Sequence, residues 1–436
     1  MTTRAKIEKS LYSISPDILN GVNCSNKENA RRIINYPAMM VPSVQESVIK
    51  SILDYYPEEI SLLDPFMGAS NTLVTGMKFG VNVYGQDINP LSILISQVKT
   101  KIYDYSLSEK FEDLILKLDR SRSTKIEIDF NNIDKWFKKE VQVELSQIYR
   151  AILKEPDINI RKFYWVTLAE VIRLTSNDRT STFKMHVRPL EEITKRNLSP
   201  KEYFKKIGKR NIADLLTLKN ELSEKGFVAE NSYQKSVGVH WGDSKLKINT
   251  KARCNLLVTS PPYGDNQTTV TYGQFSYLPL QWIPISEIDE KINIDYLKAI
   301  QSIDSLSLGG KTVQDYNLVE RMLFEKSTTL FTLFQKFNEN QRIKAKKVLN
   351  FFHDLDSTID NILNSMEGDS YLIWTVGNRS VNKEVVENDN IITELFKSKG
   401  VDLFVDLERD ILGKRMPNKN NFSSTMSKEK ILIFKN

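Results

Sequence analysis

The sequence is poor in the residues from which disulfide frameworks and metal sites are built. Its 436 residues include two cysteines, Cys24 and Cys254, and three histidines, His186, His240 and His353. Two cysteines exclude a disulfide framework and a cysteine-built zinc site, and they suit a reducing cytosol. Three scattered histidines cannot form a cluster, so we expect no bound metal.

Long apolar runs are also missing. No uncharged apolar stretch approaches the ~18–20 residues that a membrane-spanning helix needs. The first ten residues carry charges where a secretory signal peptide needs an apolar segment. The sequence therefore predicts a soluble intracellular protein without membrane contact.

The composition is otherwise that of a globular protein, with 40% hydrophobic and 27% charged residues. At roughly 150 residues per domain, the length predicts two to three structural units. Lys+Arg at 61 against Asp+Glu at 55 leaves a net charge of +6, which mildly favours an anionic partner such as nucleic acid. This excess is too small to decide anything alone.

Short apolar stretches bounded by turns alternate with amphipathic helical patterns. This alternation predicts an α/β fold with a doubly wound, mostly parallel, Rossmann-like sheet and large helical insertions. The predicted strands are 60–63, 81–85, 237–241, 254–259, 371–376, 401–407 and 431–434.

The strands fall into two groups, separated by a long helical stretch. Residues 1–102 are predicted to form an N-terminal segment and the first half of the core, and 103–234 a mostly helical insertion. Residues 235–436 would form the second half of the core, with a further helical insertion at about 286–366.

A glycine-containing loop, from Asp64 to Asn71, follows the first predicted strand. Small residues at the carboxyl end of a parallel strand let the backbone approach a ligand, and the next helix presents free amides. Asp64 would repel a triphosphate, so a nucleoside carrying a cationic group is the better guest. Asp87, after the second strand, could accept hydrogen bonds from ribose hydroxyls. An ordinary strand-to-helix turn is the alternative interpretation.

A second motif, Ser260-Pro261-Pro262-Tyr263, follows the strand 254–259. Two prolines remove two backbone donors, so their carbonyls can point into a cleft. The Ser260 hydroxyl and a proline carbonyl would offer acceptors to both protons of an exocyclic amine. A planar base could stack on Tyr263. A plain turn is the alternative.

Taken together, these motifs resemble those of the S-adenosylmethionine-dependent DNA amino-methyltransferases, in the branch that methylates the N4 amine of cytosine. The fold implied is their seven-stranded methyltransferase sheet. Ser70 stands where the family commonly has a second glycine, which leaves the backbone path of the loop open. The resemblance assigns cofactor binding to Tyr36, Pro37, Asp64, Pro65, Phe66, Gly68, Ser70, Asn71, Asp87, Ile88 and Asp243, and catalysis to Ser260, Pro261, Pro262 and Tyr263.

The resemblance also implies a reaction. The methyl group of S-adenosylmethionine would pass to a cytosine flipped out of duplex DNA, with Tyr263 stacked on the ring and Ser260 holding the amine. Methylation at ring carbon 5 would need a cysteine nucleophile in a Pro-Cys loop, and neither cysteine lies in one. The family implies a prokaryotic cytoplasmic restriction-modification enzyme, double-stranded DNA as partner, and a cognate restriction endonuclease as a candidate second partner.

Three alternative functions remain open. Adenine N6 methylation is disfavoured because Ser260 stands where that branch typically has an acid or amide. An RNA base is a second target class, although no recognisable RNA-binding module precedes the core. A non-enzymatic DNA-binding subunit would be expected to have decayed motifs, and Asp64, Gly68, Asp87, Ser260 and Tyr263 are all intact.

Two segments of the first insertion carry candidate DNA contacts. Residues 173–188 mix guanidinium and amide groups that can interact with base edges, and the basic run 195–210 could follow phosphates. A polar helix-to-loop connection and a solvated helix face are the respective alternatives. Basic residues at 342–347 are a rival recognition element. The candidate nucleic-acid-binding residues are Arg173, Asn177, Arg179, Lys184, Arg188, Lys205, Lys206, Lys209 and Arg210.

Overall fold

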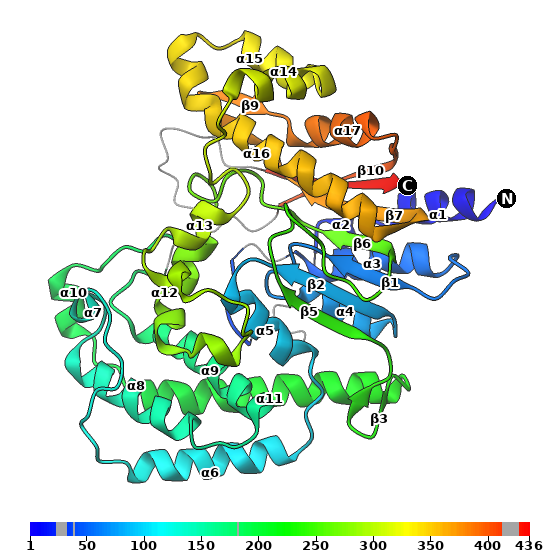
Figure 1. The fold of residues 1–436 in the computed structure, drawn as a ribbon. Coiled ribbons are helices and arrows are strands. Elements are labelled where there is room, and N and C mark those ends of the chain that lie inside the picture. The colour runs from blue at the N-terminus through cyan, green and yellow to red at the C-terminus, as the bar shows by residue number, and fades with distance from the viewer. Residues whose placement is uncertain (23–32, 38–39, 181–182, 412–426) are drawn as a thin grey trace.

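The computed structural model of the chain describes residues 1–22, 33–37, 40–180, 183–411 and 427–436. Seven strands form one sheet in the order β10-β11-β7-β6-β1-β2-β5 (Figure 1). The strands from β5 to β7 pair in parallel, whereas β11 runs antiparallel to both β7 and β10. This confirms the predicted Rossmann-like, mostly parallel sheet. The strands are β1 (Ser61–Asp64), β2 (Asn82–Asp87), β5 (Val237–Trp241), β6 (Cys254–Thr259), β7 (Met366–Val376), β10 (Asp402–Asp410) and β11 (Lys428–Lys435).

Each face of the sheet has its own apolar core. Because neighbouring residues of a strand point to opposite faces, Leu62 and Leu256 pack in one core, and Leu63 and Leu257 in the other. Burial on both faces explains why these strands are continuous apolar runs. The first face is covered by α3 (Pro42–Leu53), α4 (Asn71–Lys78) and α5 (Pro90–Thr100), and the second by α16 (Glu339–Ser365) and α17 (Asn388–Ser398).

Inserted helices extend the first core well beyond the sheet (Figure 1). Helix α9 is buried along most of its length, and it packs against α5, α8, α11 and α12. The division of the chain into three domains stays a prediction. The inserted helices of the first group are α6 (Ser106–Arg120), α7 (Ile133–Trp136), α8 (Lys139–Ile152), α9 (Ile158–Thr175), α10 (Leu190–Lys195) and α11 (Pro200–Glu224), and the short strands β3 (Val228–Ala229) and β4 (Ser232–Tyr233) follow them.

The second group of inserted helices divides between the two cores. Phe275 and Ile303 belong to the core that contains α9, whereas Leu308 and Val319 belong to the core under α16. The chain therefore passes from one face of the sheet to the other between Ile303 and Leu308. The helices are α12 (Tyr272–Trp282), η2 (Ile285–Glu287), η3 (Ile294–Leu297), α13 (Ser302–Leu306), α14 (Tyr316–Lys326) and α15 (Thr328–Gln335).

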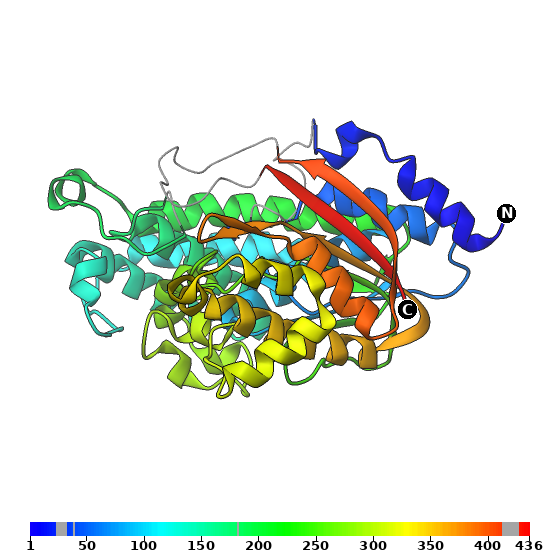
Figure 2. The same ribbon diagram turned by 90° about the horizontal axis from the view of Figure 1, so that it is seen from above.

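The remaining elements lie at the β10 side of the sheet. Helices α1 (Thr3–Tyr12) and α2 (Pro16–Leu19) pack against α3 and β10 (Figure 2). A short hairpin of β8 (Arg379–Val381) and β9 (Glu384–Val386) follows β7. None of the helices in the described part of the chain is both long and apolar enough to cross a membrane.

The order of the strands creates a crevice. From β1 the chain adds β2 and β5 on one side, and it then returns to place β6 on the other side of β1. The loops that leave β1 and β6 therefore diverge. In open α/β sheets, ligands bind at such a switch point, outside the carboxyl ends of the strands.

Candidate active site

A pocket with about 910 Å³ of atom-free space, part of it open to solvent, lies at this switch point. The loops that follow β1, β2, β5 and β6 all contribute to its walls. Of the residues predicted from the sequence, it brings together Tyr36, Pro37, Asp64, Pro65, Phe66, Gly68, Asn71, Asp87, Ile88, Asp243, Ser260 and Pro262.

Asp64 is a buried carboxylate at the end of β1. One of its oxygens accepts hydrogen bonds from the Thr259 hydroxyl at 2.7 Å and from the Phe66 amide at 3.1 Å. Burial raises the pKa of Asp64 to about 6, although these hydrogen bonds act in the opposite direction. No lysine or arginine of the described residues forms an ion pair with it, so the pocket retains an uncompensated carboxylate that suits a cationic guest.

Asp87 joins the end of β2 to the loop that follows β1. Its carboxylate accepts hydrogen bonds from the Gly68 amide at 2.9 Å and from the Asn89 amide at 2.8 Å, and burial raises its pKa. A carboxylate has about four acceptor positions, so Asp87 can still accept from ligand hydroxyls. Gly68 has φ +48°, a left-handed conformation in which a side chain is strained.

Ser70 adopts the other left-handed conformation of this loop, with φ +57°. It is the N-cap residue of α4, but its side chain makes no capping hydrogen bond and is instead buried against the Ser96 hydroxyl of α5. Ser70 is therefore not among the residues that line the pocket, in contrast to Asn71. The prediction that Ser70 contacts the cofactor is not supported by this placement, because its hydroxyl faces the helix behind the loop.

One face of α5 holds the loop from behind. The Ser92 hydroxyl donates to the Gly68 carbonyl, and the Lys99 ammonium donates to the Ala69 carbonyl and to the Asn71 side chain. Lys99 is 1% exposed, so these contacts lie in the interior. Together with Ser96, these side chains recur at helical spacing and fix the loop conformation that the missing glycine left open.

The proline motif forms the wall opposite the glycine loop. Ser260 and Pro262 line the pocket, whereas Pro261 and Tyr263 are not part of its lining. Tyr263 nevertheless contacts the site, because the Ser260 hydroxyl lies 3.4 Å from the Tyr263 hydroxyl. The Tyr263 hydroxyl lies 3.0 Å from the Glu429 carboxylate.

Two buried amide atoms at the pocket lack a partner within the described residues. They are Nδ2 of Asn71 and Oδ1 of Asn266, one donor and one acceptor. Buried polar groups are usually hydrogen-bonded. These atoms therefore suit a polar ligand, in keeping with the carboxylates of Asp64, Asp87 and Asp243 nearby.

Comparison with known proteins places the chain in a family. No family model matches the chain. It is, however, 34% identical over 435 residues to the type II methyltransferase M.MvaI of Kocuria varians, a match that covers 96% of this chain and 93% of that protein. The chain belongs to the type II methyltransferases. The methyltransferase is also 32% identical to the type II methyltransferase M.MjaII of Methanocaldococcus jannaschii, over 104 residues that cover 23% of this chain and 18% of the relative.

Among solved structures, the methyltransferase matches the rRNA methyltransferase aviRa of Streptomyces viridochromogenes. The match covers 98% of this chain and 92% of the other at 8% identity, with a TM-score of 0.31. A TM-score this low supports no conclusion about the methyltransferase. The type of fold therefore rests on the strand order and directions described above.

The predicted nucleic-acid contacts are divided between interior and surface. Arg173 is 9% exposed, pairs with Glu170 at 3.2 Å and stacks over the Phe275 ring at 4.6 Å. Asn177 is 6% exposed, and its side chain donates to the Lys135 carbonyl at 3.1 Å. Both side chains thus make contacts within the protein in this structure, and their contact with bases stays a prediction.

The loop that follows α9 carries both exposed and partly buried polar residues among those that the structure describes. Arg179 and Lys184 are exposed, whereas Arg188 is half-buried and donates to the Asp178 carbonyl at 3.0 Å. The loop is attached to the start of α12, because the Thr271 hydroxyl donates to the Phe183 carbonyl at 3.0 Å. It therefore approaches the pocket residue Tyr272.

The basic run on α11 is partly used within the protein. Lys209 pairs with Glu112 of α6 at 2.8 Å, and Arg210 donates to the Asn211 side chain at 2.9 Å. Lys205 is half-buried, and Lys206 is exposed. The run is therefore not one continuous solvated face, and its role in DNA contact stays a prediction.

The rival recognition element on α16 is also engaged. Arg342 pairs with Glu320 at 3.0 Å, and Lys347 donates to the Gln267 side chain at 2.8 Å. These contacts do not choose between the two segments. Cys24, Ala38 and Met39 lie outside the described residues.

A further wall of the pocket lies largely outside the recognised sequence motifs. Asn266, Tyr272, Ile303, Ser307 and Leu308 line it, and all of them belong to the second insertion or to the segment that leads into it. Tyr272, Ile303, Ser307 and Leu308 belong to no recognisable motif, whereas Asn266 ends the stretch that contains the proline motif. They reach the pocket only because the chain crosses between the two cores at this point.

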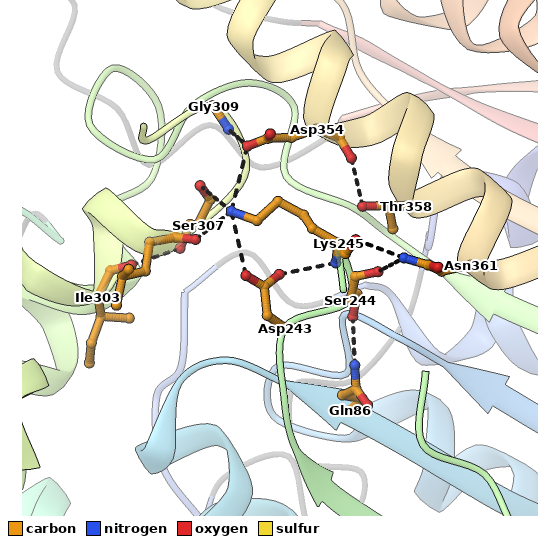
Figure 3. A network of polar contacts seen from close by, with 11 residues as sticks. Gln86, Asp243, Ser244, Lys245, Ile303, Ser307, Gly309, Asp354, Thr358 and Asn361 are labelled. Atoms are coloured by element: carbon orange, nitrogen blue, oxygen red, sulfur yellow. Dashed lines mark hydrogen bonds and ion pairs between the residues drawn. The ribbon is translucent and has the colours of Figure 1, made fainter. Parts of the chain in front are cut away.

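Lys245 ties this wall to the end of β5 (Figure 3). Its ammonium donates to the Leu306 carbonyl at 2.7 Å, and it lies 3.6 Å from the Asp243 carboxylate and 3.5 Å from the Asp354 carboxylate of α16. Asp354 in turn accepts from the Gly309 amide at 2.9 Å. Charged side chains thus hold the segment that crosses between the cores at two points, Lys245 at Leu306 and Asp354 at Gly309.

Proposed function

We propose that this type II methyltransferase transfers a methyl group from S-adenosylmethionine to the exocyclic N4 amine of a cytosine flipped out of duplex DNA. The observation that carries the proposal is that Ser260 and Pro262 line the same pocket as Asp64 and Asp87. A candidate amine-binding motif thus faces a candidate nucleoside site. In the cell, the enzyme would be the modification partner of a restriction endonuclease acting on the same site.

The residues present fit S-adenosylmethionine. Asp64 has no cationic partner among the described residues and suits the charged methionine end, while Asp87 suits the ribose hydroxyls. Asp243 and the apolar side chains of Ile88 and Leu308 suit the adenine. When bound, this cofactor supplies an activated methyl group.

The proline motif suits the nucleophile. The Ser260 hydroxyl and the Pro261 carbonyl would accept hydrogen bonds from the two amine protons and direct the nitrogen lone pair toward the methyl group. Alignment of this kind supplies much of the rate, and no strong base is needed because the proton leaves after the nitrogen has become cationic. Since the amine is enclosed within a duplex, the base must be flipped out first.

DNA contact is proposed for the surface loop that contains Arg179 and Lys184. Both side chains are exposed, and the loop is attached to α12 through the Phe183 carbonyl and through the Met185 amide, which donates to the Gln274 side chain at 3.1 Å. A contact made there lies beside the pocket. Lys205 and Lys206 of α11 are proposed as additional phosphate contacts.

Identification of the product tests the proposal. The purified protein is incubated with duplex DNA and labelled S-adenosylmethionine, and the DNA is then digested to nucleosides for mass analysis. N4-methylcytosine is expected, and mapping of the modified positions would define the recognition site. N6-methyladenine would instead refute the inference from Ser260.

Two further outcomes address the remaining alternatives. Methyl transfer to RNA but not to DNA would assign an RNA base as the target. DNA binding without any affinity for the cofactor would favour a non-enzymatic subunit. Calorimetric titration of S-adenosylmethionine separates this last case from a catalytic defect, because it does not depend on turnover.

A further inference from the structure

A line of hydrogen-bonding groups leads from the pocket to the last strand of the sheet. It begins at the Ser260 hydroxyl, passes to the Tyr263 hydroxyl at 3.4 Å, and ends at the Glu429 carboxylate at 3.0 Å. Ser260 lines the pocket, whereas Glu429 belongs to β11 on the far side of β7. The three groups meet only because of the fold, since 166 residues separate Tyr263 from Glu429.

The end of this line is held in place by an ion pair. Arg409 of β10 is the cross-strand neighbour of Glu429, and its guanidinium donates to the second Glu429 oxygen at 2.8 Å. Arg409 is 9% exposed and also donates to the Leu19 carbonyl. Hydrogen bonds between charged groups are shorter and stronger than neutral ones, so this pair holds the carboxylate in one orientation.

Tyr263 is also held from its backbone. Asn388, at the start of α17, donates from its side-chain amide to the Tyr263 carbonyl at 3.0 Å and to the Gly377 carbonyl at 2.7 Å. Tyr263 is thus held at its backbone by Asn388 and at its hydroxyl by Glu429. This rigidity gives the hydroxyl contacts a defined geometry.

The chemistry of the groups sets the direction of the hydrogen bonds. An ionised carboxylate only accepts, so Tyr263 must donate to Glu429. The Tyr263 oxygen is then free to accept, so the Ser260 hydroxyl donates to it. With its hydrogen committed in this way, Ser260 presents its lone pairs to the pocket. Burial and the neighbouring Glu429 raise the pKa of Tyr263 well above its ordinary value, which keeps it a donor.

We propose that Glu429 is a positioning residue that makes the Ser260 hydroxyl an acceptor and provides the end point for the proton released by the methylated amine. This inference rests on the proposed function, because it requires an amine nucleophile at Ser260. An adenine amine would meet the requirement as well as a cytosine amine. The inference is therefore independent of the identity of the base.

The proton movement balances. After the carbon–sulfur bond has broken and the carbon–nitrogen bond has formed, the nitrogen carries one positive charge and one surplus proton. This proton passes to the Ser260 oxygen as the Ser260 proton passes to Tyr263 and the Tyr263 proton passes to Glu429. Both hydroxyls are regenerated, and Glu429 becomes a neutral acid. Its side chain is 15% exposed, so water can take the proton away.

A double-mutant cycle tests the line. Tyr263→Phe keeps the aromatic ring but removes the hydroxyl, and Glu429→Gln keeps the shape but removes the charge. General acid–base groups contribute roughly 10²–10⁴-fold, and proton release after methyl transfer should contribute less, so we expect each variant to slow single-turnover methyl transfer about 10-fold. The double variant should also be slowed about 10-fold, because the two residues act as one unit.

Glu408→Gln is the matched control. Glu408 lies on the same hairpin but is exposed and pairs with Lys428 and Lys430, so its rate should equal that of the unmodified protein. DNA affinity measured by fluorescence anisotropy, and cofactor affinity measured by calorimetry, should be unchanged in Glu429→Gln. A defect confined to the transfer rate separates positioning from loss of folding or binding.

A spectroscopic measurement tests the contact without turnover. In protein labelled with 3-fluorotyrosine, Tyr263→Phe identifies the ¹⁹F resonance of residue 263 by its disappearance. We expect Glu429→Gln to shift this resonance and Glu408→Gln to leave it in place. An unmoved resonance in Glu429→Gln would overturn the inference even if the enzyme were inactive.

Two kinetic results would also contradict the inference. Full activity of Glu429→Gln would show that the carboxylate is dispensable, and independent effects that multiply to about 100-fold would show that the two residues do not act together. Absence of methyl transfer by the unmodified protein would instead refute the proposed function itself. The failure of the relay and the failure of the function are therefore distinguishable.

Discussion

Two walls of the pocket differ in origin. One consists of loops at the ends of β1, β2, β5 and β6 and carries Asp64, Asp87 and Ser260. The other consists of inserted segments and carries Tyr272, Ile303, Ser307 and Leu308. Asp64, Asp87 and Ser260 of the first wall were predicted from motifs, whereas none of the four residues named for the second wall was predicted.

The difference follows from how each wall is built. Parallel strands end at one edge of the sheet, so motifs that follow successive strands must gather there. The inserted wall depends on where the chain crosses between two cores, and many apolar sequences could satisfy that packing. We therefore expect substitutions in the sheet wall to affect chemistry, and substitutions that release the inserted wall to affect affinity.

The largest effect is expected from Ser260→Ala. Removal of one preorganised hydrogen-bonding group at a reacting atom costs about 10²–10³-fold in turnover, whereas S-adenosylmethionine affinity should stay within about twofold. Single-turnover methyl transfer and calorimetric titration measure the two quantities. Ser232→Ala, at an exposed position of β4, is the control. Normal methyl transfer by Ser260→Ala would show that this residue of the sheet wall is not needed for the methyl-transfer step.

Lys99→Met is expected to have the next largest effect, and on stability. It leaves the Ala69 carbonyl and the Asn71 side chain without their buried donor, which costs about 2 kcal/mol of unfolding free energy. Urea denaturation measures this loss, and cofactor affinity should fall with it. Lys101→Met, at the exposed end of the same helix, should change neither. Equal stability of the two variants would mean that the loop holds its conformation without α5.

Cofactor affinity should depend on pH through Asp64. Its pKa is raised from 3.8 to about 6, so the carboxylate is charged above that pH and becomes neutral below it. Affinity for a cationic cofactor should therefore be nearly full at pH 7 and about 10-fold weaker at pH 5, because the charged fraction of a carboxyl group with a pKa of about 6 falls about tenfold between these two pH values. Calorimetric titration over pH 5–8 measures it. Asp64→Asn should be weak throughout and lose this acid decline, and a decline that persists in this variant would assign it to another group.

The smallest effect is expected from Lys245→Met, which tests the inserted wall. It removes the donor to the Leu306 carbonyl and the contacts with Asp243 and Asp354, so the crossing segment should loosen. A loss of about 1 kcal/mol corresponds to roughly fivefold weaker cofactor binding. Lys247→Met, at an exposed neighbouring position, is the control. A fall in turnover at saturating cofactor with unchanged cofactor affinity would contradict the inference that the inserted wall affects affinity and the sheet wall affects chemistry.

Ser70 and Arg173 have a conformation and an environment that the sequence alone did not predict. The position of the glycine loop could be predicted, but its second left-handed residue is Ser70 and not a glycine. The buried face of α5 supplies hydrogen bonds that support the strained backbone there. Arg173 was expected at a nucleic-acid surface. Its guanidinium lies over the Phe275 ring and pairs with Glu170, because the same polar pattern can be satisfied by neighbours inside a helical bundle.

The sequence by itself determined the α/β class, the seven strands and the motifs at the strand ends, because strand periodicity and turn chemistry are local properties. Only the tertiary structure decided which residues far apart in the chain meet at those ends. Examples of such contacts are Glu429 with Tyr263, Lys99 with the glycine loop, and Lys245 with the crossing segment. Their partners are set by strand order and helix packing, and neither leaves a mark within a short stretch of sequence.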